Sequence, residues 1–230
     1  MQTVDSVQNY YETLVTGYDD LSDKVVMENT ALQQAIFDAI NISNDSEFRM
    51  LDLGIGTAST AKKILARYPH AYVVGVDFSD EMIRVAAHTL SEFFERTKLV
   101  QEDINELELR PYGKFDLVIS AVTIHNIPHA SKATLFKEVF QSLTENGVFI
   151  NGDFVAGETE NEENETAYLY RNFLESNLSG DELHKWLEHA FEFDMPMKLS
   201  EQITLLKAAG FNEVRTVWQH PREAVYVATK

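Results

Sequence analysis

The segment Leu51 to Thr57 constrains the fold most, because it joins an apolar strand to a helix through two glycines. Arg49 to Leu53 has the apolar character of a buried strand, and Gly54 and Gly56 follow at once. Glycine has no Cβ, so the backbone of such a turn can approach a bound ligand closely. Strand, glycine loop and helix in this order predict the ligand-binding turn of a doubly wound α/β fold.

The rest of the chain continues this alternation and predicts one domain over residues 1–230. Helices are expected within 1–45, before the first strand, and a helical cap insertion is expected over 155–198. Strands followed by helices predict a mostly parallel sheet covered on both faces. The link His220-Pro221-Arg222 predicts that the last two strands are antiparallel. The predicted strands are 49–53, 71–77, 98–100, 115–121, 148–154, 213–219 and 224–229.

Local signals place several helix ends. Ser79 is a candidate N-cap for the helix after the second strand, and Ser179 with Glu182 forms a predicted capping box. Asn146-Gly147 is expected to end the helix that starts near Ser131. Gly210 is expected to end the helix over 199–209 in the left-handed conformation.

Two carboxylates near the glycine loop indicate the ligand. Asp77 ends the second strand, where a carboxylate can accept hydrogen bonds from the hydroxyls of a ribose. Asp52 stands just before the loop, where the pyrophosphate of a dinucleotide would be repelled. Ser59 replaces the third glycine of the dinucleotide pattern. S-adenosylmethionine (SAM) carries an ammonium and a sulfonium, so the carboxylate of Asp52 favours SAM over NAD(P).

Composition excludes several function classes. The net charge of −18, without a Lys/Arg cluster, disfavours nucleic acids and anionic membranes as partners. The chain has no cysteine, which excludes disulfides and thiolate chemistry and favours a cytoplasmic protein. Residues 1–20 lack the pattern of a signal peptide, and no apolar run is long enough to span a bilayer.

The ordered motifs make the sequence similar to class I SAM-dependent methyltransferases from residue 49 to 230. The resemblance implies a seven-stranded sheet of order 3-2-1-4-5-7-6 with strand 7 antiparallel. One departure is Ala58, where the family usually has a third glycine; the small side chain is expected to alter packing only slightly. The motif segments are 52–57, 74–79, 101–104, 115–121, 146–150 and 208–211.

The same resemblance implies a set of cofactor-binding residues. Asp77 would bind the ribose and Asp103 the adenine amine, while a tyrosine of the first helices, Tyr10, Tyr11 or Tyr18, would close over the methionine end. The full expected set is Tyr18, Asp52, Gly54, Gly56, Thr57, Asp77, Phe78, Met82, Asp103, Ile104, Ala121 and Val122.

His125 and Asp153 are the candidate catalytic residues. Methyl transfer needs alignment of the two reactants, and it needs a base only where the nucleophile starts protonated. His125 follows the fourth strand, at the edge where doubly wound folds bind ligands, and an unperturbed pKa of about 6.5 suits proton transfer near neutrality. Asp153 ends the fifth strand and is expected to bind or deprotonate a substrate.

The acceptor is expected to be a small molecule, neutral or cationic. The segment after the fourth strand, 120–128, lacks the Asn/Asp-Pro-Pro-aromatic arrangement associated with methylation of adenine or glutamine nitrogens. Cap residues Glu158, Tyr168, Arg171 and Trp186 are candidates for its pocket. The histidines lack metal-ligand spacing, which predicts no metal, and a homodimer through the amino-terminal helices or the cap is compatible with the sequence.

Two alternatives remain open at the level of sequence. One is a SAM-using enzyme with different chemistry, similar to those that make a carboxylated SAM derivative, which hold the extra carboxylate with a basic residue. Arg171 is the candidate for that residue. The other alternative is a non-catalytic SAM-binding module, which the intact Asp52, Gly54, Gly56 and Asp77 disfavour.

Overall fold

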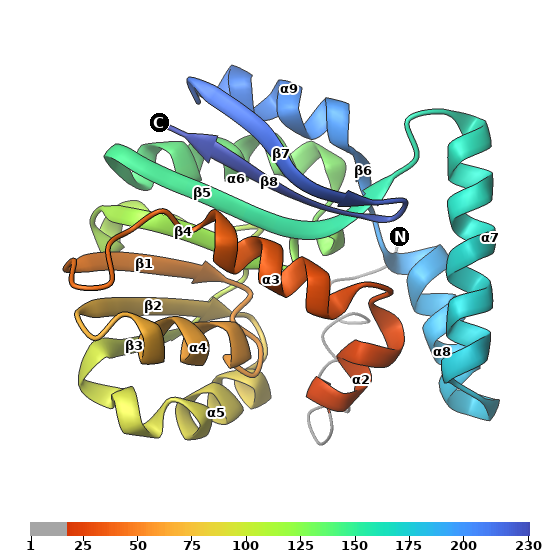
Figure 1. The fold of residues 1–230 in the computed structure, drawn as a ribbon, viewed down its shortest axis with the longest axis horizontal. Coiled ribbons are helices and arrows are strands. Elements are labelled where there is room, and N and C mark those ends of the chain that lie inside the picture. Colours follow the sequence, from red (N-terminus) through yellow and green to blue (C-terminus); the bar gives the residue numbers. More distant parts are fainter. Residues whose placement is uncertain (1–17) are drawn as a thin grey trace.

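The computed structural model describes residues 18–230, and their side chains from residue 21 onward. In this part of the chain one mixed sheet forms the centre of the molecule, with strand path β3-β2-β1-β4-β5-β8-β7 (Figure 1). The strands are β1 (Phe48–Leu53), β2 (Ala71–Asp77), β3 (Thr97–Gln101), β4 (Phe115–Ala121), β5 (Leu143–Ala156), β6 (Met197–Lys198), β7 (Glu213–His220) and β8 (Glu223–Thr229).

The predicted sheet topology is confirmed. β1 to β5 pair in parallel and β8 pairs antiparallel with both β5 and β7, as the short link at 221–222 predicts. The two-residue β6, which pairs with β5 away from the main path, was not predicted and shifts the numbers of the last two strands by one.

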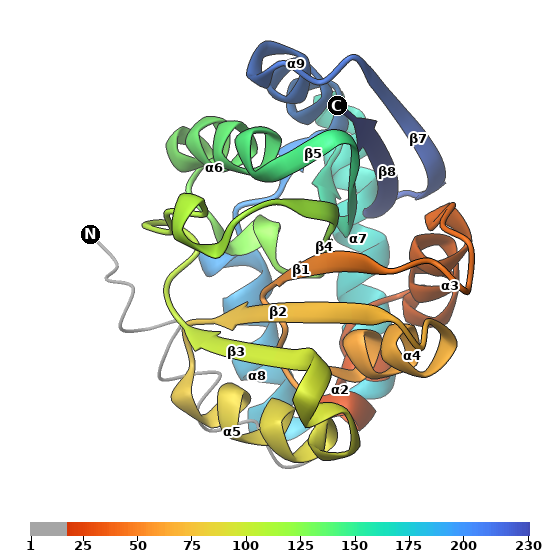
Figure 2. The same ribbon diagram turned by 90° about the vertical axis from the view of Figure 1, so that its left-hand side faces the viewer.

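Helices cover both faces of the sheet. Figure 2 shows α6 on one side of the sheet and α3 and α4 on the other. The helices are α2 (Tyr18–Val25), α3 (Asn29–Ala39), α4 (Ser59–Arg67), α5 (Asp80–Thr89), α6 (His129–Ser142), α7 (Glu160–Asn177), α8 (Gly180–Glu188) and α9 (Leu199–Ala209). Shorter helical turns are η1 (Ser91–Arg96), η2 (Arg110–Tyr112), η3 (Ile124–Asn126) and the π-helical turn η4 (His189–Phe193).

The central strands are apolar on both faces because both faces are covered. Leu51 and Leu53 of β1 pack into the cluster formed with α6 and α9, whereas Met50 packs into the cluster formed with α3 and α4. All three side chains are fully buried. Successive side chains of a strand point to opposite faces, so a run of apolar residues serves both layers, with about 1.5–3 kcal/mol gained per large side chain buried.

Some predicted helix ends hold and others do not. Ser79 Oγ accepts the backbone N–H of Met82 as an N-cap, and Gly210 ends α9 with φ of 117°. Ser179 is the N-cap of α8, so the predicted start of this helix is confirmed, but its side chain makes no capping hydrogen bond and the capping box itself is wrong. The helix α6 ends at Ser142 rather than near Asn146-Gly147, because β5 already begins at Leu143.

The predicted cap over 155–198 consists of α7, α8 and η4, and it stands with α2 beside the carboxyl ends of the parallel strands (Figure 1). A third apolar cluster joins these elements and includes Leu21, Tyr170 and Trp186. Tyr170 donates a hydrogen bond to the carbonyl of Val25, with 2.8 Å between oxygens. This packing holds α2 and the cap together above the carboxyl edge of the sheet.

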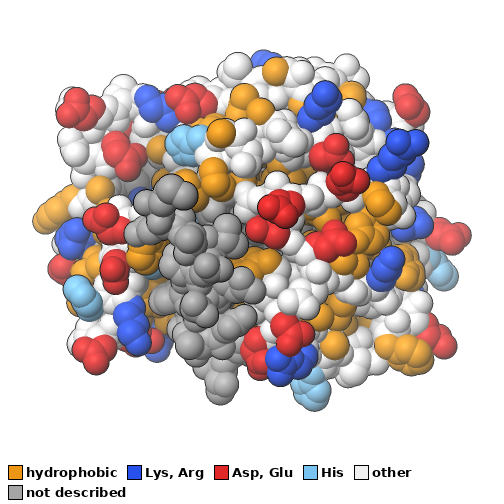
Figure 3. All heavy atoms as spheres, turned by 180° about the vertical axis from the view of Figure 1, so that it is seen from behind, with side chains coloured by type: hydrophobic (Ala, Val, Ile, Leu, Met, Phe, Trp, Pro, Cys, Tyr) orange, Lys and Arg blue, Asp and Glu red, His pale blue; other side chains and the backbone are white. Residues whose placement is uncertain are grey.

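No helix within residues 18–230 is both long and apolar enough to cross a bilayer. On the face seen in Figure 3, the described Lys and Arg side chains are interspersed with Asp and Glu rather than gathered in one patch.

Candidate functional site

A cavity of about 860 Å³ opens at the carboxyl ends of β1, β2, β4 and β5, beneath α2 and the cap. This volume lies in the range of small-molecule and cofactor sites. The predicted site residues that line it are Asp52, Gly54, Gly56, Thr57, Asp77, Phe78, Met82, Asp103, Ile104, Ala121, Val122 and His125. Tyr18 begins α2, but its side chain lies outside the described side chains, as do Tyr10 and Tyr11, so those predictions stay open.

The glycine loop is bent sharply at both glycines. Gly54 has φ of 71° and Gly56 has φ of 53°, which is the left-handed region that glycine adopts at no steric cost. A Cβ at Gly54 would come within 2.4 Å of Thr123 Oγ1, so the loop after β4 requires this glycine. A Cβ at Gly56 would meet no atom within 4 Å, so its backbone borders open space in the cavity.

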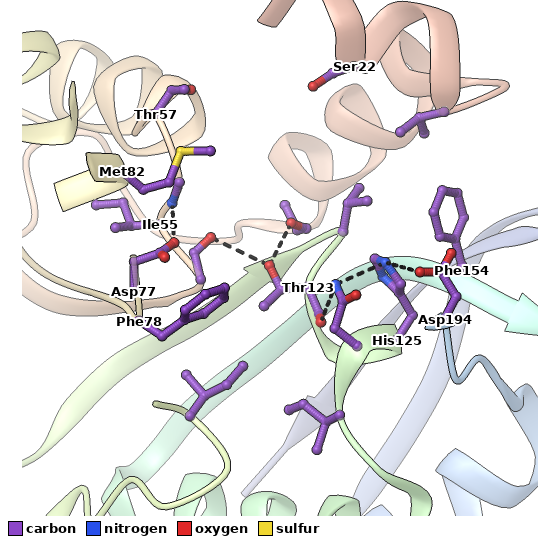
Figure 4. Close-up of a pocket in the computed structure, with 18 of the residues that line it drawn as sticks. Ser22, Ile55, Thr57, Asp77, Phe78, Met82, Thr123, His125, Phe154 and Asp194 are labelled. Atoms are coloured by element: carbon purple, nitrogen blue, oxygen red, sulfur yellow. Dashed lines mark hydrogen bonds and ion pairs between the residues drawn. The ribbon is translucent and has the colours of Figure 1, made fainter. Parts of the chain in front are cut away.

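Asp77 binds the glycine loop as well as facing the cavity. Its Oδ2 accepts the N–H of Gly56 at 2.9 Å (Figure 4). Its Oδ1 accepts the N–H of Ser79 at 3.0 Å. Burial raises the pKa of Asp77, while these backbone hydrogen bonds oppose that rise. The carboxylate therefore holds the ends of β1 and β2 together, at the position where ribose hydroxyls would reach it.

Asp52 is buried at the end of β1, 3% exposed. Burial, and then the negative charge of Asp77, raise the pKa of Asp52 to about 7. The ionised form of such a carboxyl gains from any cation placed beside it. The two carboxylates at this end thus suit a ligand that is positive near the loop, as SAM is.

Apolar side chains form the far wall of this half of the cavity. Phe78 and Met82 follow β2, and Figure 4 shows them beside Asp77. Ile104 lines the same cavity next to Asp103, whose Oδ1 accepts the backbone N–H of Asn105 at 2.8 Å. Apolar walls with a carboxylate at the rim fit a flat adenine ring, so the residues present fit SAM.

Two non-glycine residues at the loops have a left-handed backbone. Val122, after β4, has φ of 52°, and its N–H donates to the carbonyl of Gly152 at 2.8 Å. A β-branched residue rarely adopts this conformation, and such strain gathers at functional sites. Ala58 has φ of 64° before α4, so its position is not helical and the small packing change that we expected is instead a backbone strain.

His125 lies at the other end of the cavity, in η3. Its Nδ1 is 2.7 Å from Asp153 Oδ1, and its backbone N–H donates to Asp153 Oδ2 at 2.9 Å. Asn126 Nδ2, an amide donor, lies 3.0 Å from His125 Nε2. When Nδ1–H donates to the Asp153 carboxylate, Nε2 carries the lone pair of the neutral imidazole.

Asp153 does not line the cavity. Its side chain is 2% exposed and, besides His125, accepts the N–H of Phe154. Phe154 packs edge-on against the His125 ring, with 4.8 Å between ring centres. Asp153 is therefore placed to orient His125 rather than to touch a substrate.

The cap returns to the sheet directly over His125. Asp194 Oδ1 lies 3.2 Å from His189 Nε2 and 3.8 Å from His125 Nε2. The next residues are fixed from below: Met195 N–H donates to the carbonyl of His125, and Lys132 Nζ donates to the carbonyl of Met195, both at 2.8 Å. Burial lowers the pKa of Lys132 to about 8.

The cap residues named from sequence divide into two groups. Trp186 lines the cavity. Glu158 accepts hydrogen bonds from Ser200, Tyr168 is 66% exposed, and the Arg171 guanidinium lies 4.8 Å from the ring centre of Phe191. These three do not line the cavity, so the expectation that they form its pocket is wrong.

Several lining residues were not predicted from sequence. They are brought in by tertiary packing, and no local motif marks them. Thr123 and Asn126 lie in the segment 120–128 after β4. The position of this segment at the ligand-binding edge of the sheet is the signal that could have identified them. The unpredicted lining residues include Ser22, Thr123, Asn126, Phe154, Glu192, Phe193 and Asp194.

The family described as "Methyltransferase domain" matches residues 44–190. This match spans the glycine loop, Asp77, Asp103 and His125. The fold and the cavity define a Rossmann-like enzyme of the class that uses SAM. The chain belongs to this methyltransferase family and is a SAM-dependent enzyme.

Relatives of this chain carry two kinds of name. A carboxy-S-adenosyl-L-methionine synthase of Nautilia profundicola is 23% identical over 95% of this chain and 93% of its own length. A malonyl-[acyl-carrier protein] O-methyltransferase of Geobacter sulfurreducens is 37% identical, over 44% of this chain and 36% of its own. The DhpI complex with S-adenosylhomocysteine (SAH) has a similar fold, with TM-score 0.66, 17% identity and coverage of 97% and 95%.

Proposed function

We propose that this enzyme transfers the methyl group of SAM to a nitrogen, oxygen or carbon nucleophile of a small molecule by direct displacement. The observation that carries the proposal is one cavity with the glycine loop and Asp77 at one end and the His125–Asp153 pair at the other. Bound SAM would supply an activated methyl group on its sulfonium.

The residues divide the work between them. Asp77 and Asp103 would hold the ribose and adenine, and Asp52 would face the positive end of the cofactor. His125 would take a proton from the acceptor at Nε2, while Asp153 holds its Nδ1 and stabilises the imidazolium that forms.

The second candidate is synthesis of a carboxylated SAM, which the full-length relatives favour. Such a product needs a cation to hold its extra carboxylate. Among described residues, Lys63 is the one Lys or Arg that lines the cavity, and residues 1–17 contain neither type. Seven carboxylates line the same cavity, which supports the methyltransferase instead: Asp23, Asp52, Asp77, Asp103, Glu106, Glu192 and Asp194.

Calorimetry with SAM, SAH and NAD tests the cofactor. We expect SAM and SAH to bind and NAD not to bind, because Asp52 would repel a pyrophosphate. Mass spectrometry of the ligand that copurifies with the protein separates the two candidates, since SAM or SAH supports the methyltransferase and a carboxylated SAM supports the synthase. Failure of SAM and SAH to bind at millimolar concentration would overturn both.

Methyl release in the presence of a metabolite collection separates an enzyme from a non-catalytic SAM-binding module. We expect SAH to form with at least one small acceptor. We also expect the protein to act in the cytoplasm, as the lack of cysteine favours. A homodimer and the absence of a metal stay predictions.

A further inference from the structure

We propose that the acceptor is a small primary or secondary amine, which binds as a cation between His125, Asn126 and Asp194. The inference rests on the proposed methyl transfer and names the chemical class of its substrate. It comes from three features of the acceptor end of the cavity: buried acceptor atoms without a donor, aromatic walls and an excess of carboxylates.

Two oxygens beside His125 are buried and accept no hydrogen bond among the described residues. They are Asp194 Oδ1 and Asn126 Oδ1, and both residues line the cavity. The Asp194 side chain is 2% exposed, and His189 Nε2 lies 3.2 Å from its Oδ1 without a hydrogen bond between them. A buried acceptor without a donor costs free energy until a ligand supplies one.

His125 Nε2, which Asn126 Nδ2 approaches at 3.0 Å, lies beside these two oxygens and adds a third acceptor atom to this end of the cavity. Asp194 Oδ1 is 3.8 Å from His125 Nε2, too far for a hydrogen bond, and Figure 4 shows Asp194 and His125 side by side. A protonated primary amine has three N–H donors and no acceptor, whereas a hydroxyl has one donor. The number and kind of groups therefore match an ammonium better than an alcohol.

Aromatic side chains line the same end. Trp186 of α8 is nearly buried and Phe193 of η4 joins it in the lining, whereas the ring of Phe154 already lies 5.4 Å from the Arg222 guanidinium. Aromatic faces attract cations by about 0.5–2 kcal/mol. The carboxylates of Glu192 and Asp23 line the cavity nearby and add a negative field that draws a cation in.

His125 acts as the base in the proposed transfer of the methyl group to the amine. The ammonium gives one proton to His125 Nε2, which leaves a neutral amine with a lone pair. That nitrogen forms the new N–C bond as the C–S bond breaks, and sulfur keeps the electron pair, giving SAH. The product is the methylated ammonium, and the proton on His125 passes to solvent, so one proton is released per methyl group transferred.

Binding of matched amines and alcohols to the SAH-saturated protein tests the inference. The probes are benzylamine against benzyl alcohol and n-butylamine against n-butanol, measured by calorimetry. We expect each amine to bind about tenfold or more tightly than its alcohol. Mass spectrometry of the reaction with SAM should find the N-methylated form of at least one amine.

Asp194→Asn should remove most of the preference for amines, and Asn126→Ala should weaken it. Glu160→Gln is the matched control, because it removes an exposed carboxylate of α7 that does not line the cavity, and it should keep the full preference. Melting temperature and SAH affinity show whether each variant is folded. If Asp194→Asn is not folded, the amine preference of Asn126→Ala tests the inference.

Equal binding of amines and alcohols in both pairs, or an amine preference unchanged in the variants, would overturn the amine assignment. In that case SAH binding would leave the proposed methyl transfer intact, with a neutral acceptor. Absence of SAH binding in the wild-type protein would overturn the proposed function, and the amine assignment with it.

Discussion

The two ends of the cavity are built in different ways. At the cofactor end, Asp52, Gly54, Gly56 and Asp77 come from two neighbouring strands and the loop between β1 and α4. At the acceptor end, His125 meets Asp153, 28 positions away, and Asp194 of the cap. The cofactor end depends on local backbone geometry, whereas the acceptor end depends on how distant segments pack. The cofactor end can therefore serve a whole family, while the acceptor end sets what one member methylates.

Replacing His125 should give the largest effect and should be confined to the acceptor end. His125→Ala is expected to lower kcat by about 100- to 10,000-fold, because general-base catalysis contributes on that order. SAH affinity, measured by calorimetry, should stay within about twofold of the wild-type value, since Asp77 is untouched. His184→Ala, at an exposed histidine of α8, is the control. An unchanged rate with the true acceptor would remove His125 from the mechanism.

Replacing Asp77 should weaken cofactor binding and leave the acceptor end unchanged. Asp77→Asn is expected to weaken SAM binding about 10- to 100-fold, because hydrogen bonds to a charged group are worth about 1.5–3 kcal/mol each. Asp80→Asn, at an exposed aspartate of α5, should bind SAM like the wild-type protein. If Asp77→Asn kept full SAM affinity and lost only kcat, the division between the two ends would be wrong.

The pH dependence of SAM binding should report on Asp52. Its pKa is about 7 in the free protein, and a cation beside the carboxyl lowers that pKa. Binding therefore requires loss of a proton below pH 7, so affinity is full above pH 7 and falls as the pH drops. From pH 8 to pH 6 we expect a loss of about tenfold by calorimetry. The Asp52→Asn variant should bind SAM weakly and should not show this loss of affinity between pH 8 and pH 6. If the variant had the same pH profile of SAM binding as the wild-type protein, the assignment to Asp52 would be wrong.

The smallest effect concerns the strain at the cofactor loop. Ala58 has φ of 64°, and the left-handed conformation costs a non-glycine residue about 1–2 kcal/mol. Ala58→Gly should therefore stabilise the protein by about 1 kcal/mol, as measured by urea unfolding. Ala61→Gly, inside α4, is the control and should destabilise it. A loss of stability in Ala58→Gly would show that the alanine methyl packs better than its backbone suggests.

The sequence predicts the cofactor end because its signals are short-range. Glycine at positions 54 and 56 and the carboxylate of Asp77 mark a backbone geometry that neighbouring residues impose on each other. His125 and Asp153 could be placed at the edge of the sheet, because each follows a strand. Their hydrogen bond could not be foreseen, since it depends on the register of β4 and β5.

The cap shows where reasoning from sequence stops. A helical cap over 155–198 was predicted, with Ser179 at the start of its second helix, but the side chains that reach the cavity depend on how α8 and η4 pack. Asp194 lines the cavity and Glu158 does not, although both are acidic residues in loops. Met195 and Lys132 fix the segment that carries Asp194, whereas hydrogen bonds from Ser200 hold Glu158 elsewhere.

Hydrogen–deuterium exchange of the wild-type protein, with and without SAH, tests the division of the cavity most directly. Backbone groups that contact a ligand exchange more slowly. We predict the strongest protection in residues 51–58 and 77–82, with weaker protection in the cap at 186–195. Protection that is strongest in the cap, or no protection at the glycine loop despite saturating SAH, would contradict the account.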